Sequence, residues 1–407
     1  MSISREEQLI DSPTAWRRLF VSVLLSTIGG IGLWSIVVVL PAIEIEFGID
    51  RGGASLPYFA TMLGFAGGGI IMGKLSDRFG IMPPIMLGAF MLSLGYLTSA
   101  FSQSLWQFMF AQAMLIGLLG SSATFGPLIA DVSFWFRRRR GFAVAIVASG
   151  NYLSGAIWPP LMQFGIDNIG WRQTHITIAV VCVSLLIPLA RLLKQSTPKP
   201  QTRVPSNSRP QLSRDTKTLL KRPPGTQWLL IFAGTACCIA MATPQVHIVA
   251  YCFDLGYGAN RGAEILSLML AVGIISRLAF GIIADRIGGL YTLFTSSFLQ
   301  LITLFFYLPF NGLSSLYFVS MIFGLAQGGI VPSYALVIRD YFPAHEAATR
   351  ISLVLTATIA GMAIGGWMAG EIFDYAGSYL YAFINGSAWN VLNLLVVSWL
   401  LINRLRN

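Results

Sequence analysis

The octapeptide GKLSDRFG at residues 73–80 recurs as GIIADRIG at residues 281–288. The two copies share both glycines and the Asp-Arg pair, and each copy connects one long apolar stretch to the next. A charged turn that is repeated between hydrophobic helices predicts a chain built from two similar halves. The fold should therefore be a duplication, with one copy at the matching turn of each half.

Two further landmarks support the duplication. The tetrapeptide DNIG at residues 167–170 corresponds to DYAG at residues 374–377, and Pro127 corresponds to Pro332. All of these pairs occur in the same order in the two halves. Because parallel repeats are a design of membrane transporters, we expect a six-plus-six arrangement of helices.

Composition indicates that these halves lie in a membrane. Hydrophobic residues make up 55% of the 407 residues and charged residues 11%, whereas soluble proteins contain about 25% charged residues. Apolar stretches of about 20 residues can cross a hydrocarbon core about 30 Å thick. Twelve such stretches are predicted, at residues 18–42, 55–73, 81–101, 105–130, 141–163, 172–193, 227–252, 262–283, 289–309, 314–338, 350–372 and 379–402.

The sequence therefore predicts an all-α integral membrane protein with twelve transmembrane helices in two six-helix bundles. The N-terminal bundle should span residues 1–194, and the C-terminal bundle should span residues 226–407. The connection between them, residues 195–225, is rich in basic residues, Pro, Ser and Thr, and should be a flexible cytoplasmic linker.

The distribution of basic residues predicts the orientation. An excess of Lys and Arg marks the cytoplasmic side of a membrane protein, and all but four of the 27 basic residues fall on one side of the predicted helices. Both termini should therefore be cytoplasmic, in a multi-pass protein of the plasma membrane. The net charge of +10 then reflects topology and gives no support to a nucleic-acid partner. The four exceptions are Arg51, Arg172, Arg261 and Arg277.

The chain lacks the motifs of an enzyme or a metalloprotein. Its four cysteines lie in apolar runs without metal-ligand spacing. It contains no nucleotide-binding loop, no zinc motif and no nucleophile elbow. We therefore expect no metal, no cofactor and no catalytic residue.

Arg277 is the main candidate for binding a substrate. It lies well inside a predicted helix, and no acidic residue of that helix is within reach of it. A guanidinium at the centre of a bilayer costs at least about 2.5 kcal/mol, so it should face a watery cavity and an anionic partner. A substrate carboxylate fits, because arginine can bind it through two parallel hydrogen bonds. The alternative is an ion pair with an acid on another helix.

The repeated octapeptides are candidate gating elements. Their aspartates lie at the predicted membrane edge, where they could face the N-terminus of a nearby helix and pair with an arginine. Such contacts would join the halves in one state and break in the other, and a purely structural turn is the alternative. The residues concerned are Gly73, Asp77, Arg78, Gly281, Asp285 and Arg286.

Other polar and aromatic side chains complete the candidate site. His247 could relay a proton, or it could be a hydrogen-bonded structural residue. Asp131, near Arg139, should form a gating or packing ion pair, whereas Glu44 and Glu46 should be solvated. Candidate donors to a carboxylate and candidate apolar wall residues are Tyr334, Gln327, Trp34 and Phe125.

The octapeptides resemble the signature loop of the major facilitator superfamily, and the resemblance covers nearly the whole chain. A second stretch, WFRRRRGFAVA at residues 135–145 with ASGNYLSG at residues 148–155, is similar to the helix 4–5 signature of the monocarboxylate transporters. The related oxalate/formate antiporters carry a similar phrase. The resemblance implies that this helix lines the pathway, so Asn151 and Tyr152 are candidates for substrate contact, with packing as the alternative.

The same resemblance supports Arg277. Monocarboxylate transporters have an arginine four residues before a glycine in the eighth helix, as Arg277 stands before Gly281. The sequence also departs from the family, because Gly273 stands where eukaryotic members typically have an aspartate. The family's lysine in the first helix is missing as well, and so is the antiporters' lysine in helix 11. The usual proton-coupling pair is therefore absent.

These observations predict secondary active transport of a small organic monocarboxylate, similar to lactate or pyruvate, by alternating access. Coupling to H⁺ is expected, because a proton and a monoanion cross the membrane together without net charge. The alternatives are uniport, anion exchange, export of another small solute or drug, and a non-transporting membrane sensor. The expected partners are the carboxylate, H⁺ and the lipid bilayer, and the protein is expected to be a monomer.

Overall fold

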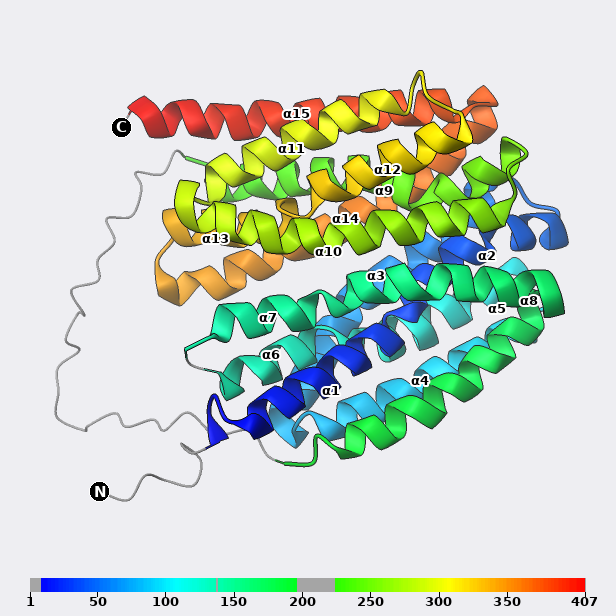
Figure 1. Ribbon diagram of the computed structural model, residues 1–407, viewed down its shortest axis with the longest axis horizontal. Helices are drawn as coiled ribbons and strands as arrows, with labels where there is room; N and C mark the ends of the chain where they lie inside the picture. The colour runs from blue at the N-terminus through cyan, green and yellow to red at the C-terminus, as the bar shows by residue number, and fades with distance from the viewer. Residues whose placement is uncertain (1–8, 137, 196–223, 407) are drawn as a thin grey trace.

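A computed structural model describes residues 9–136, 138–195 and 224–406, which form helices joined by short connections. These helices lie side by side in two bundles, one from each half of the chain (Figure 1). The predicted all-α architecture is confirmed. The predicted linker at residues 195–225 lies almost entirely outside the described residues.

The N-terminal bundle contains six crossings, several of which consist of more than one helical piece. The first crossing is α1 followed by α2, and the fourth runs from α5 through a π-helical and a 3₁₀ segment into α6. The elements are α1 (Pro13–Gly29), α2 (Ile31–Phe47), α3 (Arg51–Phe79), α4 (Met82–Ala100), α5 (Leu105–Phe110), η2 (Ala111–Gly120), η3 (Ser121–Thr124), α6 (Gly126–Trp135), α7 (Arg140–Ala148) and α8 (Gly150–Arg191).

The C-terminal bundle repeats this plan. Its fourth crossing is also broken, between α12 and α13. The helices are α9 (Thr226–Asp254), α10 (Ala259–Ile287), α11 (Gly289–Phe306), α12 (Leu313–Gln327), α13 (Ile330–Tyr341), α14 (Ala344–Ala376) and α15 (Tyr379–Arg406). The paired landmarks Pro127 and Pro332 each lie in the first turn of the helix that follows the break, where a proline is tolerated.

The predicted count of twelve crossings is confirmed. Eleven helical segments in the described part of the chain are long and apolar enough to span a membrane, and one of them, Gly141–Arg191, has 51 residues. This segment turns at Gly170, whose φ of 79° and ψ of 159° interrupt the helix. Only glycine adopts this conformation without strain, so Gly170 divides the segment into two crossings. The equivalent Gly377 ends α14 in a left-handed conformation.

The two ends of the molecule differ in how the halves meet. We call the end where α1 begins and α15 finishes the terminal end, on the left of Figure 1, and the opposite end the far end. Among the described residues, the hydrogen bonds that join the halves extend from Arg51 at the far end to Arg277. No such bond in which both partners are described residues lies closer to the terminal end than Arg277. The halves are therefore closed together at the far end.

Close packing of helices supports this closure. An apolar core lies within the N-terminal half, and a larger one continues across both halves. Gly366 on α14 packs against the ring of Tyr58 on α3, where an added Cβ would lie 2.7 Å from the ring. Gly155 on α8 likewise packs against Leu270 on α10. Small residues let the helices of the two halves approach each other at these points.

Candidate functional site

Arg277 lies on α10, and its guanidinium projects toward the N-terminal half. Its Cζ is 4.1 Å from the centroid of the Tyr152 ring, and its Nη1 donates to the carbonyl oxygen of Ala148 at 3.3 Å. Its Nε is buried and has no hydrogen-bond partner. No carboxylate in the described part of the chain forms an ion pair with it. The guanidinium thus retains donor capacity for an anion.

The N-terminal half contacts Arg277 at a helix junction. The helix α7 ends at Ala148, and α8 begins at Gly150, so the carbonyl and the ring that contact Arg277 lie on either side of a break. On α10, one turn before Arg277, a Cβ at Gly273 would lie 2.7 Å from the Tyr152 ring. The ring therefore occupies the space in which an aspartate at position 273 would stand, and it provides a π face for the cation instead.

The break in the tenth crossing also lies beside Arg277. A Cβ added at Gly328, between α12 and α13, would clash with Ser276 and with the backbone nitrogen of Arg277. The Ser276 hydroxyl donates to the carbonyl oxygen of Leu325. Broken helices therefore approach Arg277 from both halves, which fixes its position along the molecule.

Two more of the predicted residues are adjacent to Tyr152. The indole nitrogen of Trp34 donates to the carbonyl oxygen of Asn151 at 3.1 Å and to its side-chain oxygen at 3.3 Å. Gly155, one turn further along α8, lies against the same indole. The structure thus brings Trp34, Asn151 and Tyr152 together on the N-terminal side of Arg277. Phe125 lies at the break before α6 and packs on Phe65, with ring centroids 5.9 Å apart.

The remaining candidates in the C-terminal half have partners of their own. Gln245 donates to Gln327 at 2.5 Å, which leaves the oxygen of Gln245 and the nitrogen of Gln327 without partners in a buried setting. The hydroxyl of Tyr334, which is fully buried, donates to the side-chain oxygen of Asn393 at 3.0 Å. Of these residues, the glutamine pair has polar atoms left to meet a ligand.

The two octapeptides lie at the terminal end, and among the described residues no ion pair joins one to the other. Gly73 and Gly281 have no atom within 4 Å of the position of an added Cβ. The charged members, Asp77, Arg78, Asp285 and Arg286, are exposed, and they form no ion pair with a described residue. This matches a state in which the halves are separated at the terminal end.

Asp131 forms a buried ion pair within the N-terminal half. Its carboxylate accepts two hydrogen bonds from Arg18 on α1, at 2.7 and 2.9 Å. Arg18 also donates to the carbonyl oxygen of Gln195 at 2.9 Å, and its Cζ lies 4.5 Å from the Trp135 ring centroid. The pair therefore ties α1 and α6 to the segment after α8. Arg139, which precedes α7, is exposed.

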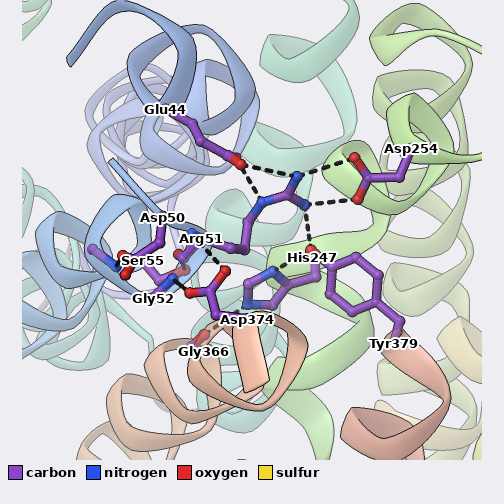
Figure 2. Close-up of polar contacts among 11 residues, drawn as sticks. Glu44, Asp50, Arg51, Gly52, Ser55, His247, Asp254, Gly366, Asp374 and Tyr379 are labelled. Carbon is purple, nitrogen blue, oxygen red and sulfur yellow. Dashed lines mark hydrogen bonds and ion pairs between the residues drawn. The ribbon is translucent and has the colours of Figure 1, made fainter. Parts of the chain in front are cut away.

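A second charged cluster lies at the far end, centred on Arg51 (Figure 2). Asp50 caps α3 by accepting from the backbone of Gly53 at 2.8 Å, so Arg51 is the first residue of the helix. Arg51 is 3% exposed and pairs with Glu44 from its own half and with Asp254 from the other half. Expecting Glu44 to be solvated was wrong, because its carboxylate lies 2.6 Å from the guanidinium.

Glu46 is exposed, as expected, with 38% of its side chain accessible, although it also takes part in an ion pair. Its carboxylate pairs with Arg172 at 2.6 Å and accepts a hydrogen bond from the indole of Trp171. This second far-end ion pair lies entirely within the N-terminal half.

His247 belongs to the cluster around Arg51. Its Nε2 donates to the carbonyl oxygen of Gly366 at 2.7 Å, so its Nδ1 in the neutral ring accepts from the hydroxyl of Tyr379 at 3.0 Å. The same hydroxyl accepts from Arg51 at 2.5 Å. We call Glu44, Arg51, His247, Asp254, Asp374 and Tyr379 the far-end network.

Sequence reasoning did not find the far-end network, although a signal was present. The ends of the second, seventh and eleventh predicted helices at the far side carry Arg51, Asp254 and Asp374. Charges of opposite sign that lie at the same membrane edge in different halves are candidates for pairing. The sequence did not reveal which of these helix ends are adjacent.

Comparison with known proteins places the chain among transporters. Residues 22–323 and 265–407 match the family described as Major Facilitator Superfamily. The chain is 26% identical to monocarboxylate transporter 13 of Bos taurus in an alignment of 328 residues that covers 77% of this chain and 72% of the relative. It is 24% identical to the MFS-type transporter pynF of Aspergillus niger over 320 residues, which are 78% and 71% of the two chains.

Solved structures share the fold at low sequence identity. A peptide transporter, POT, in complex with sulfate has a TM-score of 0.74 at 16% identity, over 98% of each chain. A bacterial homolog of the human lysosomal transporter Spinster, in an inward-facing and occupied conformation, has a TM-score of 0.72 at 14% identity. That match covers 96% of this chain and 97% of the homolog.

Proposed function

This chain belongs to the Major Facilitator Superfamily, and from that premise we propose that it transports a small organic monocarboxylate, similar to lactate or pyruvate, by alternating access. Arg277 is the proposed carboxylate-binding residue. The single observation that carries the proposal is a guanidinium between the two halves that has a ring and a carbonyl as partners and no carboxylate among the described residues.

The charge of the site supports a monoanion. Arg277 is half-buried, and transfer of its charge from water into a membrane is unfavourable unless an anion compensates it. A carboxylate can accept two parallel hydrogen bonds from a guanidinium. One cation matches one negative charge, so binding a monocarboxylate leaves the site neutral. Trp34 and the Tyr152 ring are buried aromatic groups near that charge, which suits an organic anion better than an inorganic one.

The position of Arg277 supports a role in alternating access. It contacts both halves and is the cross-half hydrogen-bonding residue nearest the terminal end in the described ranges. With the termini in the cytoplasm of a plasma-membrane protein, as the basic residues indicate, the far end is the outer end. The proposed cycle alternates this state with one in which the far end is open and the terminal end is closed.

We expect substrate uptake in proteoliposomes to depend on Arg277. Arg277→Ala should reduce monocarboxylate transport at least about a hundredfold, because it removes a charge-assisted bidentate contact worth roughly 3 kcal/mol. Arg277→Lys should retain only part of the activity, since an ammonium cannot bind a carboxylate through a planar fork. Uptake of lactate, pyruvate and a neutral analogue should be measured for each variant.

The control is Gly69→Ala on α3, where an added Cβ has no atom within 4 Å. Equal transport by wild type and Arg277→Ala would overturn the proposed substrate and favour a neutral one. Coupling to H⁺ is a separate part of the proposal. It predicts that an imposed pH gradient, acidic outside, drives accumulation of the carboxylate in the proteoliposomes. Carboxylate accumulation that does not change with the gradient would favour uniport or anion exchange.

A further inference from the structure

The guanidinium of Arg51 is shared between two carboxylates that belong to different halves. Glu44 lies at 2.6 Å from Nε and at 3.4 Å from Nη2. Asp254 lies at 3.0 Å from Nη1 and at 3.1 Å from Nη2. Glu44 is on α2, in the same half as Arg51, whereas Asp254 ends α9 in the other half. Figure 2 shows the two acids on either side of the guanidinium.

Further contacts of the far-end network also cross between the halves. Tyr379 accepts from Nη1, and its ring and that of Phe373 lie near the guanidinium, at 5.7 and 4.8 Å. Asp374 accepts from the backbone nitrogens of Arg51 and Gly52 at 3.0 and 2.5 Å, which places a negative charge at the N-terminus of α3. All of these partners except Glu44 come from the C-terminal half.

Separating the halves would therefore remove every partner of the guanidinium except one. Glu44 and Arg51 are joined by a short connection and move together, so their ion pair can persist when the far end opens. A guanidinium left without any carboxylate would carry a larger penalty at that membrane edge.

We infer that Arg51 holds the far end closed through Asp254 and that Glu44 retains the same guanidinium when the far end opens. Arg51 is then a gating residue that loses its partners in the other half when the far end opens and keeps the carboxylate of its own half. The inference rests on the alternating-access part of the proposed function and is independent of the substrate.

The inference predicts opposite effects for the two acids. Asp254→Asn weakens a bond that exists only in the closed state, so it should favour the open far end. Glu44→Gln leaves Arg51 bound to Asp254 and Tyr379 in the closed state, but it removes the carboxylate that remains in the open state. Glu44→Gln should therefore favour the closed far end, although both variants remove one negative charge from the same cation.

The opening rate can be measured at Ser55, which is fully buried beneath the network and donates to the carbonyl oxygen of Arg51 at 2.8 Å. In the Ser55→Cys variant, a hydrophilic maleimide should react with the introduced thiol only when the far end opens. The four native cysteines are buried, and mass spectrometry of the labelled peptide identifies the site. We expect Asp254→Asn to raise the labelling rate about tenfold or more and Glu44→Gln to lower it several-fold.

The matched control is Glu46→Gln, because the Glu46–Arg172 pair is at the same end but within one half. It should leave the labelling rate unchanged. Tyr379→Phe, which removes one cross-half hydrogen bond and keeps the ring, should raise the rate and serves if Asp254→Asn does not fold. The inference is overturned if Glu44→Gln speeds labelling as Asp254→Asn does, or if neither Asp254→Asn nor Tyr379→Phe changes the rate.

The test also separates the gating role of Arg51 from the proposed substrate. Labelling needs no substrate, so it can succeed or fail whatever the transporter carries. Arg277→Ala in the same background should abolish carboxylate uptake. It should not change the order of labelling rates among the variants of the far-end network. If the protein with Arg277 in place takes up carboxylate but the variants do not show the expected order of labelling rates, the gating role alone is wrong.

Discussion

At the scale of single residues, the two arginines that join the halves have different surroundings. Arg51 is 3% exposed and has two carboxylates and a hydroxyl as partners. Arg277 is half-buried, with an aromatic ring, one carbonyl and an unpaired Nε. A buried arginine with its acids in place is suited to hold a structure together, whereas one that lacks an acid is suited to bind an anion. These different surroundings support the proposed gating role of Arg51 and the proposed substrate contact of Arg277.

Tyr152 should set the position of the Arg277 guanidinium through its ring. The hydroxyl of Tyr152 forms no hydrogen bond with a described residue, so the ring face is the relevant group. Tyr152→Leu should raise the KM for the carboxylate about two- to thirty-fold, since a cation–π contact contributes about 0.5–2 kcal/mol. Tyr152→Phe is the matched control and should leave KM near the wild-type value. An equal rise in KM for both variants would point to the hydroxyl.

At the scale of helices, hydropathy predicted where the crossings lie but not where they break. The predicted spans differ from the observed helices by only a few residues at each end. They agree this well because about 20 apolar residues are required to cross the bilayer. The π-helical segment Ala111–Gly120 and the junction at Ser149 were not predicted. Such breaks depend on tertiary contacts that re-satisfy the backbone, and hydropathy does not report those contacts. The junction at Ser149 nevertheless determines which carbonyl Arg277 contacts.

The Arg18–Asp131 pair should stabilise the arrangement of α1 and α6. Both side chains are 4% exposed, so Asp131→Asn leaves a buried cation with a neutral partner. We expect the free energy of unfolding to fall by about 3 kcal/mol or more, which a thermal-unfolding measurement of the purified protein would detect. Glu264→Gln is the comparison, because the Arg261–Glu264 pair is 53% and 43% exposed and should contribute little. Equal thermal shifts for the two variants would contradict a structural role for Asp131.

At the scale of the whole molecule, the repeat predicted the duplication but not which end of the molecule is closed. The octapeptides, the glycines that end each tetrapeptide and the two prolines occupy matching places in the halves, as their order indicated. Which end is closed depends on pairings such as Asp374 with the first residues of α3, which lie more than 300 positions apart in the chain. A single sequence carries the charges of such a pairing but not the proximity of the helix ends.

Alternating access requires the far end to open in every cycle, so a covalent bond across it should stop transport. A Cβ at Gly370 on α14 would lie 2.8 Å from the hydroxyl oxygen of Ser55 on α3 and 2.8 Å from the carbonyl oxygen of Arg51, so a small shift of the helices is needed to admit it. Ser55→Cys with Gly370→Cys should therefore form a disulfide under mild oxidation. We expect uptake in proteoliposomes to fall to background after oxidation and to return on reduction. Each single variant, treated with the same oxidant, should keep its own rate. Full transport by the oxidised double variant, with the cross-link verified by mass spectrometry, would show that the halves need not separate at this end, because a disulfide between α3 and α14 leaves no room for a substrate to pass there.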